Sequence, residues 1–162
     1  MKPTMKAGIT LGVLVFLWTL VMGLTGWYKD PVLLNVFYVV ILIQVGVLVW
    51  GLRMTAAEGR SYAGQVKAGT ALSAIGAIII FFGSLLFTTV FFPHYFEELR
   101  EAGRHVLAAQ GMTEQQIATT LDAQAAMQTP LMQALLGAIM TVVTGLVVSI
   151  VLAAFIRKKA SA

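Results

Sequence analysis

Four long segments without a charged residue constrain the fold of this chain more than any other feature of its sequence. They are residues 8–27, 32–52, 70–92 and 131–156. A helix needs about 20 mostly apolar residues to cross the roughly 30 Å hydrocarbon core of a bilayer. Each segment meets that length. The sequence therefore predicts an all-α integral membrane four-helix bundle, with residues 1–162 forming a single membrane domain.

The overall composition excludes several classes of function. Charged residues make up 11% of the chain, whereas soluble domains are about a quarter charged. The formal charge of +4 would suggest nucleic acid in a soluble protein, but the apolar content points to a lipid bilayer, so no nucleic-acid partner is expected. The chain has no cysteine, which excludes a disulfide framework, a thiolate zinc site and a cysteine nucleophile. It also carries no nucleotide-binding or hydrolase motif, so we expect neither an enzyme nor a cofactor.

The lysines and arginines predict the direction of the spans, because positive residues gather on the cytoplasmic side of a membrane. One side of the predicted spans carries most of the basic residues, namely Lys2, Lys6, Arg53, Arg60, Lys67, Arg157, Lys158 and Lys159. The other side carries most of the acids. This pattern predicts that the N- and C-termini both lie on the cytoplasmic side. The first span resembles a secretory signal, but its length and the lack of an A-x-A site favour an uncleaved span.

Two connections between the spans have recognisable local signals. The turn "WYKDP" joins the first two spans, with Pro31 placed to open the second helix. In the loop before the third span, Ser61 is a candidate N-cap. We expect a short interfacial helix there that leads into the span.

Residues 94–128 are too many for a structureless loop and are expected to form an extramembrane helical hairpin between spans three and four. Pro93 would start its first helix, and Gly111 would divide the two helices. Thr113 and Gln116 fit a capping box at the start of the second helix, which should run to about residue 128. Thr129 and Pro130 would then cap and open the fourth span.

A row of acids and histidines on the first hairpin helix is a candidate metal site. His94, Glu98, Glu101 and His105 share one helix face. However, they spread over about 16 Å at 1.5 Å per residue, too far for one ion. A metal would need a subset such as Glu98, Glu101 and His105 with ligands from a second helix. The favoured alternative is a solvated surface with helix pairs Glu97–Arg100 and Glu101–Arg104 or Glu101–His105.

Small and polar residues inside the spans predict how the helices pack. Small side chains let helix backbones approach closely in lipid, and amides form hydrogen bonds between helices. The candidate packing residues are Gly137, Thr141, Gly145 and Ser149 in span four, Gly69 and Ser73 at span three, and Gln44 in span two. The candidate outer interface belt consists of Trp27, Tyr28, Phe92, Tyr95 and Phe96.

The order of several short motifs resembles one bacterial family. "EGRSYAGQVKAG" stands before the third span and "FFPHYFEEL" follows it; "GMTEQQI", "TPLMQALLG" and "FIRKK" come afterwards. This order is similar to that of the family called domain of unknown function 4199, over nearly the whole chain, although Tyr62 departs from the more usual aliphatic–Phe pattern. The resemblance implies a four-span inner-membrane protein without an assigned activity. It also implies that Pro93, Tyr95 and Glu98 mark a shared exit from the third span.

These features predict a non-enzymatic protein that acts through association, as an accessory or scaffold subunit of a membrane complex. Its expected partners are the lipid bilayer and other membrane-protein subunits or a second copy of itself. The alternative is a small-solute or lipid transporter that works as an oligomer. The spans lack the ionisable residues that pumps and transporters generally place in the bilayer. A metal-dependent site on the hairpin is a third interpretation.

Overall fold

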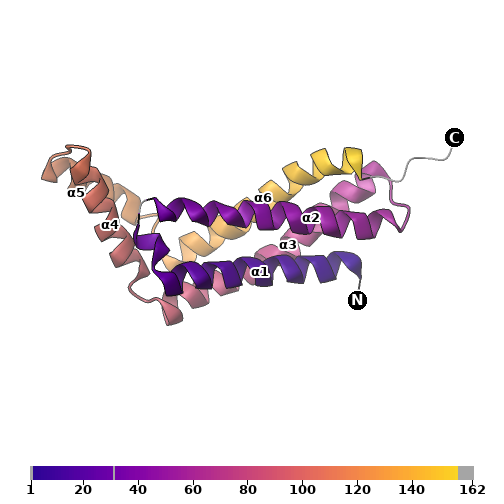
Figure 1. The fold of residues 1–162 in the computed structure, drawn as a ribbon, viewed down its shortest axis with the longest axis horizontal. Helices are drawn as coiled ribbons and strands as arrows, with labels where there is room; N and C mark the ends of the chain where they lie inside the picture. Colours follow the sequence, from indigo (N-terminus) through magenta and orange to yellow (C-terminus); the bar gives the residue numbers. More distant parts are fainter. Residues whose placement is uncertain (1, 31, 157–162) are drawn as a thin grey trace.

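The computed structural model describes residues 2–30 and 32–156, and within these ranges the chain is helical, with no strand. Figure 1 shows four long helices running alongside one another, with two shorter helices, α4 and α5, beyond one end. In chain order the elements are α1 (Pro3–Thr25), two 3₁₀ helices η1 (Trp27–Lys29) and η2 (Leu33–Tyr38), α2 (Val39–Ala56), α3 (Tyr62–Leu86), a π-helical turn η3 (Phe87–Phe91), α4 (Tyr95–Ala109), α5 (Glu114–Ala125) and α6 (Pro130–Phe155).

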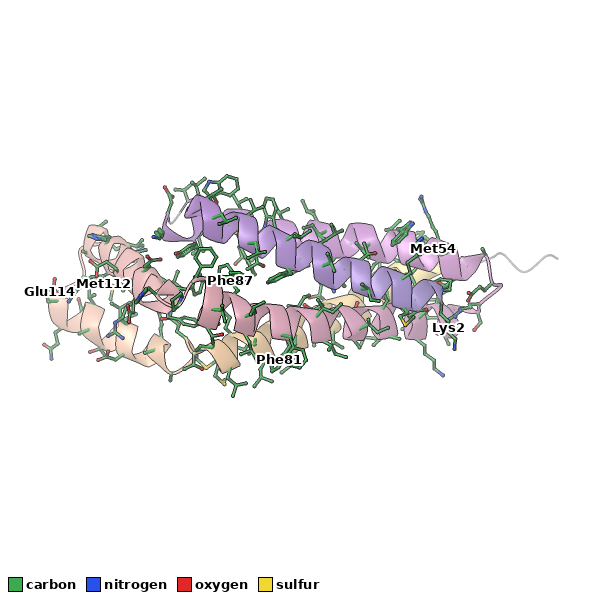
Figure 2. The ribbon with its side chains drawn as sticks, turned by 90° about the horizontal axis from the view of Figure 1, so that it is seen from below. Lys2, Met54, Phe81, Phe87, Met112 and Glu114 are labelled. Atoms are coloured by element: carbon green, nitrogen blue, oxygen red, sulfur yellow. The ribbon has the colours of Figure 1, made fainter. Side chains whose placement is uncertain are left out.

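We call the end of the bundle next to α4 and α5 the hairpin end, and the end with Lys2 the N-terminal end. Figure 2 places Lys2 and Met54 together at the N-terminal end and Met112 and Glu114 at the far tip of the hairpin. The α4–α5 pair thus forms the helical hairpin that the sequence predicted between the third and fourth long helices.

Among the described residues, four helical stretches are long and apolar enough to cross a membrane: Pro3–Thr25, Leu33–Ala56, Tyr62–Phe91 and Pro130–Phe155. Large apolar side chains also cover the outside of the bundle; Leu42 is 71% exposed and Phe82 is 64% exposed. In water such a surface would be unfavourable, whereas lipid tails are as apolar as these side chains. The chain is an all-α, multi-pass membrane protein.

Helix α3 is central in the bundle, because it packs against α1, α2 and α6. It runs parallel to α1, with Gly8 facing Ile75 and Gly12 facing Ile79. It runs antiparallel to α6, with Gly69 facing Ser149 and Gly145 facing Ser73. Each facing pair contains a glycine, so the backbones can approach closely at these points.

The helix ends follow the local signals in most places. The hydroxyl of Thr113 accepts a hydrogen bond from the Gln116 backbone N–H, and the Gln116 side chain accepts one from the Thr113 N–H, which confirms the capping box. The Thr129 hydroxyl accepts a hydrogen bond from the Met132 N–H, and Pro130 opens α6 as predicted. Between the hairpin helices, Gly111 has φ +81°, a left-handed conformation that favours glycine. Pro31 and residues 157–159, which carry the C-terminal basic residues, lie outside the described residues.

The N-cap at Ser61 is confirmed, since its hydroxyl accepts a hydrogen bond from the Gly64 N–H. Two other local predictions are wrong. Helix α3 continues without a break from Tyr62, so no separate interfacial helix forms. The first hairpin helix begins at Tyr95 with His94 as its N-cap, so Pro93 lies outside it. The second is α-helical to Ala125, and hydrogen bonds to the Gln124 carbonyl continue as far as the Gln128 N–H, near the predicted end.

Candidate functional site at the hairpin end

The last turn of the third long helix is a π-helix, Phe87–Phe91, which carries aromatic side chains at both of its ends. The Phe92 N–H bonds to the Phe87 carbonyl, five residues earlier, over 2.8 Å. The Thr88 and Thr89 hydroxyls donate to the carbonyls four residues before them, a local competition that bends helices. Pro93 then ends the helix, because it has no N–H and its ring clashes with the preceding turn. Figure 2 shows Phe87 where the bundle meets the hairpin.

Four aromatic rings from three segments form a cluster at this point, which we call the aromatic cluster: Tyr28, Phe87, Phe92 and Tyr95. The Tyr28 and Tyr95 ring centroids lie 4.9 Å apart, and those of Phe87 and Phe92 lie 4.6 Å apart. Phe87 contacts Tyr95 edge-on at 5.4 Å. Phe87 is only 2% exposed and Tyr28 only 4%. The cluster therefore ties the α1–α2 connection to the start of the hairpin.

Glu98 fastens the hairpin to the α1–α2 connection through two polar contacts. The Tyr28 hydroxyl donates a hydrogen bond to Glu98 Oε2, and Lys29 Nζ forms an ion pair with Glu98 Oε1 at 2.9 Å. The hydrogen bond from Tyr28 and then that from Lys29 hold the pKa of Glu98 below its usual range. Burial, followed by the bond to Glu98, raises the pKa of Tyr28 far above its usual range. At neutral pH the pair is therefore a neutral tyrosine donating to a charged carboxylate, which is a strong type of hydrogen bond.

A cavity of ≈520 Å³ lies beside the aromatic cluster, between the hairpin and the bundle. This volume falls within the range of about 300–1,000 Å³ typical of small-molecule sites. Its polar lining residues are Thr19, Tyr28, Asn35, Tyr38, Tyr95 and Gln133; its apolar ones are Met22, Leu34, Phe37, Phe87, Met127, Leu136, Gly137 and Met140. Both limbs of the hairpin contribute, Tyr95 from the start of α4 and Met127 from beyond α5.

The 3₁₀ segment η2 forms one wall of this cavity. The Asp30 carboxylate accepts hydrogen bonds from the Val32 and Leu33 N–H groups and so caps the turn from which η2 starts. Deeper in the bundle, Gln44 Nε2 donates to the Thr141 carbonyl at 2.6 Å and joins α2 to α6. Thr141 and Gln44 are not among the residues that line the cavity. The cavity thus occupies the hairpin end, and the α2–α6 contact lies below it.

The predicted packing residues meet in the bundle. A Cβ built on Gly69 would collide with the Ser149 side chain, and one built on Gly145 would collide with that of Ser73. Both serines are fully buried. The Nε2 atom of Gln44 would lie 3.3 Å from a Cβ on Gly145. Gly137 has more space and faces Ile80 at 3.9 Å by the same construction.

The hairpin is held together by ion pairs between its two helices, and part of the predicted pairing within α4 is wrong. Arg100 binds Asp122 and Arg104 binds Glu114, both on α5. These arginines do not pair with Glu97 and Glu101, because the antiparallel partner helix brings acids within their reach. Ile117 and Leu121 of α5 are buried, and Leu121 contacts Gly103 of α4.

The three candidate metal ligands, Glu98, Glu101 and His105, have different contacts. Glu98 is engaged by Tyr28 and Lys29, whereas Glu101 and His105 pair with each other at 3.4 Å on the solvent side. His94 contacts Glu97 at 3.0 Å. Within residues 2–30 and 32–156, no group of three or more His, Cys, Asp or Glu side chains is placed to hold a metal ion.

A model of the family described as "Protein of unknown function (DUF4199)" matches residues 6–158. The chain belongs to this family. Searches of curated proteins and of solved structures find no match to it. The matched range includes α1 from residue 6 onward, the other three long helices and the whole hairpin. The aromatic cluster and the cavity therefore belong to the part of the chain that the family model covers.

In this DUF4199 protein, the residues predicted for an interface belt have two kinds of environment. Tyr28, Phe92 and Tyr95 point into the aromatic cluster. Trp27 instead packs edge-on against Trp18 with centroids 6.3 Å apart, and Phe96 packs against Tyr95. Sequence reasoning placed Lys29 and Gln133 at the outer end of the bundle but did not predict that they or Phe87 belong to this site. The Thr-Thr pair before Pro93 was the available signal for the π-turn that positions Phe87.

Proposed function

We propose that this DUF4199 protein is a non-enzymatic accessory or scaffold subunit of the bacterial inner membrane. It acts by association with other membrane-protein subunits or with a second copy of itself. The observation that carries the proposal is the fixed hairpin. Two interhelical ion pairs hold its shape, and Glu98 and the aromatic cluster hold its angle to the bundle. A polar structure fixed beyond the membrane presents the same surface to every partner and needs little ordering when it binds.

The proposed orientation places both termini in the cytoplasm and the hairpin in the periplasm. The basic residues Lys2, Lys6, Arg53, Arg60 and Lys67 belong to the N-terminal end of the bundle or to the α2–α3 connection beside it. Positive residues favour the cytoplasmic side. Lys6 also lies over the Trp50 ring, 5.7 Å from its centroid, and a tryptophan with a neighbouring cation is typical of a membrane–water interface.

The helix contacts in the spans support a packing role for the polar side chains there. Gln44 donates to a backbone carbonyl of α6. Thr55 donates to Gln65 at 2.6 Å between α2 and α3, and both are buried. Side chains engaged between helices stabilise the bundle rather than present their polar atoms to a moving solute.

The second candidate function is a small-solute or lipid transporter acting as an oligomer, and the cavity favours it. The cavity combines hydrogen-bonding and apolar walls at a membrane-interface level. It would serve transport only if a route continued past the Gln44–Thr141 contact toward the N-terminal end. Whether a route passes this contact therefore distinguishes a transporter from an accessory subunit.

Photo-crosslinking in cells tests the association. A photoreactive residue is placed at Ala118, an exposed residue of α5 in the groove beside α4. The matched position is Val147, which is 56% exposed on the lipid-facing side of α6. Association through the hairpin predicts one or a few discrete adducts from Ala118 and diffuse or no protein adducts from Val147. Releasing the hairpin with the double variant Tyr28→Phe, Glu98→Gln should weaken the Ala118 adducts. A monomer without adducts in cells, and also by sizing in gentle detergent, would contradict the proposal.

A further inference from the structure

We propose that the cavity at the hairpin end binds one membrane lipid that has an apolar tail and a small, uncharged, hydrogen-bonding head. The inference concerns binding alone; it requires neither a partner subunit nor a transport route. Three properties of the cavity carry it: its position, the change from polar to apolar lining along α6, and its charge.

The position gives the cavity access to the bilayer. Its walls on η2 and α6 include side chains that are exposed at the surface of the bundle, such as Phe37 at 45% and Met140 at 57%. These elements belong to helical stretches that cross the membrane. A molecule in the cavity can therefore keep its tail among lipid chains while its head lies under the hairpin.

Along α6 the lining changes from polar to apolar with depth, while Thr19 adds a polar group deeper on α1 and Phe87 and Met127 add apolar ones at the hairpin end. Tyr28 and Tyr95 come from the connections at this end, and Gln133 lies in the first turn of α6. Leu136, Gly137 and Met140 follow along α6 toward the centre of the bundle. This order matches an amphipathic molecule aligned with the helices, with its head toward the hairpin.

One half-buried hydroxyl in the lining is available as a donor to a ligand. The Tyr28 hydroxyl already donates to Glu98. Burial raises the pKa of Tyr95 above its usual range, so its hydroxyl keeps its proton at neutral pH. A tyrosine hydroxyl can donate to a carbonyl or hydroxyl oxygen on the ligand head.

The charge of the cavity selects against an anionic head. Its lining residues are tyrosine, asparagine, glutamine, threonine and apolar side chains, with no lysine, arginine, aspartate or glutamate among them. Lys29, whose Nζ lies 5.5 Å from the centroid of the Tyr28 ring, forms an ion pair with Glu98. A phosphate buried there would lose water without gaining a cation, which is costly. Diacylglycerols and prenylated quinones share the required chemistry, whereas phosphatidylglycerol lacks it.

Native mass spectrometry of the full chain in detergent, titrated separately with a diacylglycerol, a prenylated quinone and phosphatidylglycerol, tests the proposal. We expect one-to-one binding of at least one uncharged lipid, at an affinity about tenfold above that for phosphatidylglycerol. The uncharged lipid that binds, the diacylglycerol or the prenylated quinone, identifies the class of lipid that occupies the cavity. Equal binding of all three lipids, or no binding of either uncharged lipid, would overturn the proposal.

Two variants locate the binding. Gly137→Leu fills the cavity at a position where a Cβ meets nothing closer than 3.9 Å, so the fold should tolerate it. It should lower the affinity about tenfold or more. The matched control Ala138→Leu enlarges the next residue, which faces the apolar groove between α3 and α6 instead, and should leave the affinity within about twofold. Unchanged binding in Gly137→Leu, with its melting temperature preserved, would contradict the site. The crosslinking adducts from Ala118 report separately on the proposed association.

Discussion

Toward the N-terminal end, α3 meets α6 through pairs of small residues. Gly69 faces Ser149, Ser73 faces Gly145, and a Cβ at either glycine would collide with its partner. At the hairpin end, the same bundle carries Tyr28, Phe87 and Tyr95 around a cavity of ≈520 Å³. Lipid supplies no hydrophobic force to bring helices together, so close packing of small residues must stabilise the bundle. The comparison indicates that one half of the bundle maintains the fold, which leaves the other half free to hold a cavity and the hairpin.

The largest expected effect comes from adding volume where helices touch. In Gly8→Val, the new Cβ would lie 2.7 Å from the Leu72 carbonyl oxygen and 2.7 Å from Ile75 Cβ, and backbone cannot yield as a side-chain tip can. We expect a loss of about 1–3 kcal/mol in the free energy of unfolding, as for other overpacked cores. The control is Gly46→Val in α2, where a Cβ meets nothing within 4 Å. The free energy of unfolding of both variants is measured by SDS titration in bicelles. Equal stabilities would contradict the role of close helix packing at Gly8.

A smaller effect is expected at the border between the two halves. Gln44→Leu removes the hydrogen bond from α2 to the Thr141 carbonyl and should cost about 0.6–2 kcal/mol. The control in the same assay is Leu42→Met, a change at a lipid-exposed residue of the same helix. A neutral Gln44→Leu would show that α2 and α6 are held by packing alone.

The sequence predicted the features that depend on local signals. The uncharged segments gave the four long helices, and Thr113 with Gln116 gave the start of α5, because a cap and its partner lie within one turn. The spacing of Gly69, Ser73, Gly145 and Ser149 placed these residues on helix faces, although not which helix each would meet. The candidate site was harder, since Tyr28 and Glu98 lie 70 residues apart in the chain. Arg100 and Arg104 were paired with neighbours on their own helix because only the folded hairpin brings Asp122 and Glu114 near.

Acid should release the hairpin before it affects the bundle. Because the pKa of folded Glu98 lies below 4.5, its contacts add stability above that value and lose it as the pH falls through the folded pKa. Hydrogen exchange in the first turns of α4 should therefore stay constant from pH 7 to about 5, after correction for intrinsic rates, and increase below about pH 4. At neutral pH, Glu98→Gln should speed this exchange about two- to fivefold. The control Glu97→Gln, at a carboxylate that pairs with the exposed His94 of the same turn, should not. A matching acceleration in both variants would contradict the role of Glu98.

The smallest effect is expected within the hairpin itself. Arg104 and Glu114 are exposed, with 49% and 78% of their side chains accessible. A double-mutant cycle with Arg104→Gln and Glu114→Gln should give a coupling of about 0.2–1 kcal/mol. Added salt should reduce that coupling, because exposed charges are screened. A coupling of zero at low salt would show that Ile117 and Leu121 hold the hairpin without help from its charges.

Cysteine accessibility tests the difference between the two halves most directly, because the chain has no cysteine of its own. Thr19→Cys places a thiol in the wall of the cavity, and Ser73→Cys places one in the fully buried contact with Gly145. A small, polar, uncharged thiol reagent is added from the periplasmic side of spheroplasts, and the rate of labelling is measured for each variant. The account predicts labelling of Thr19→Cys and none of Ser73→Cys. Labelling of both at similar rates would reveal a polar route past Gln44 and would contradict the account in favour of transport.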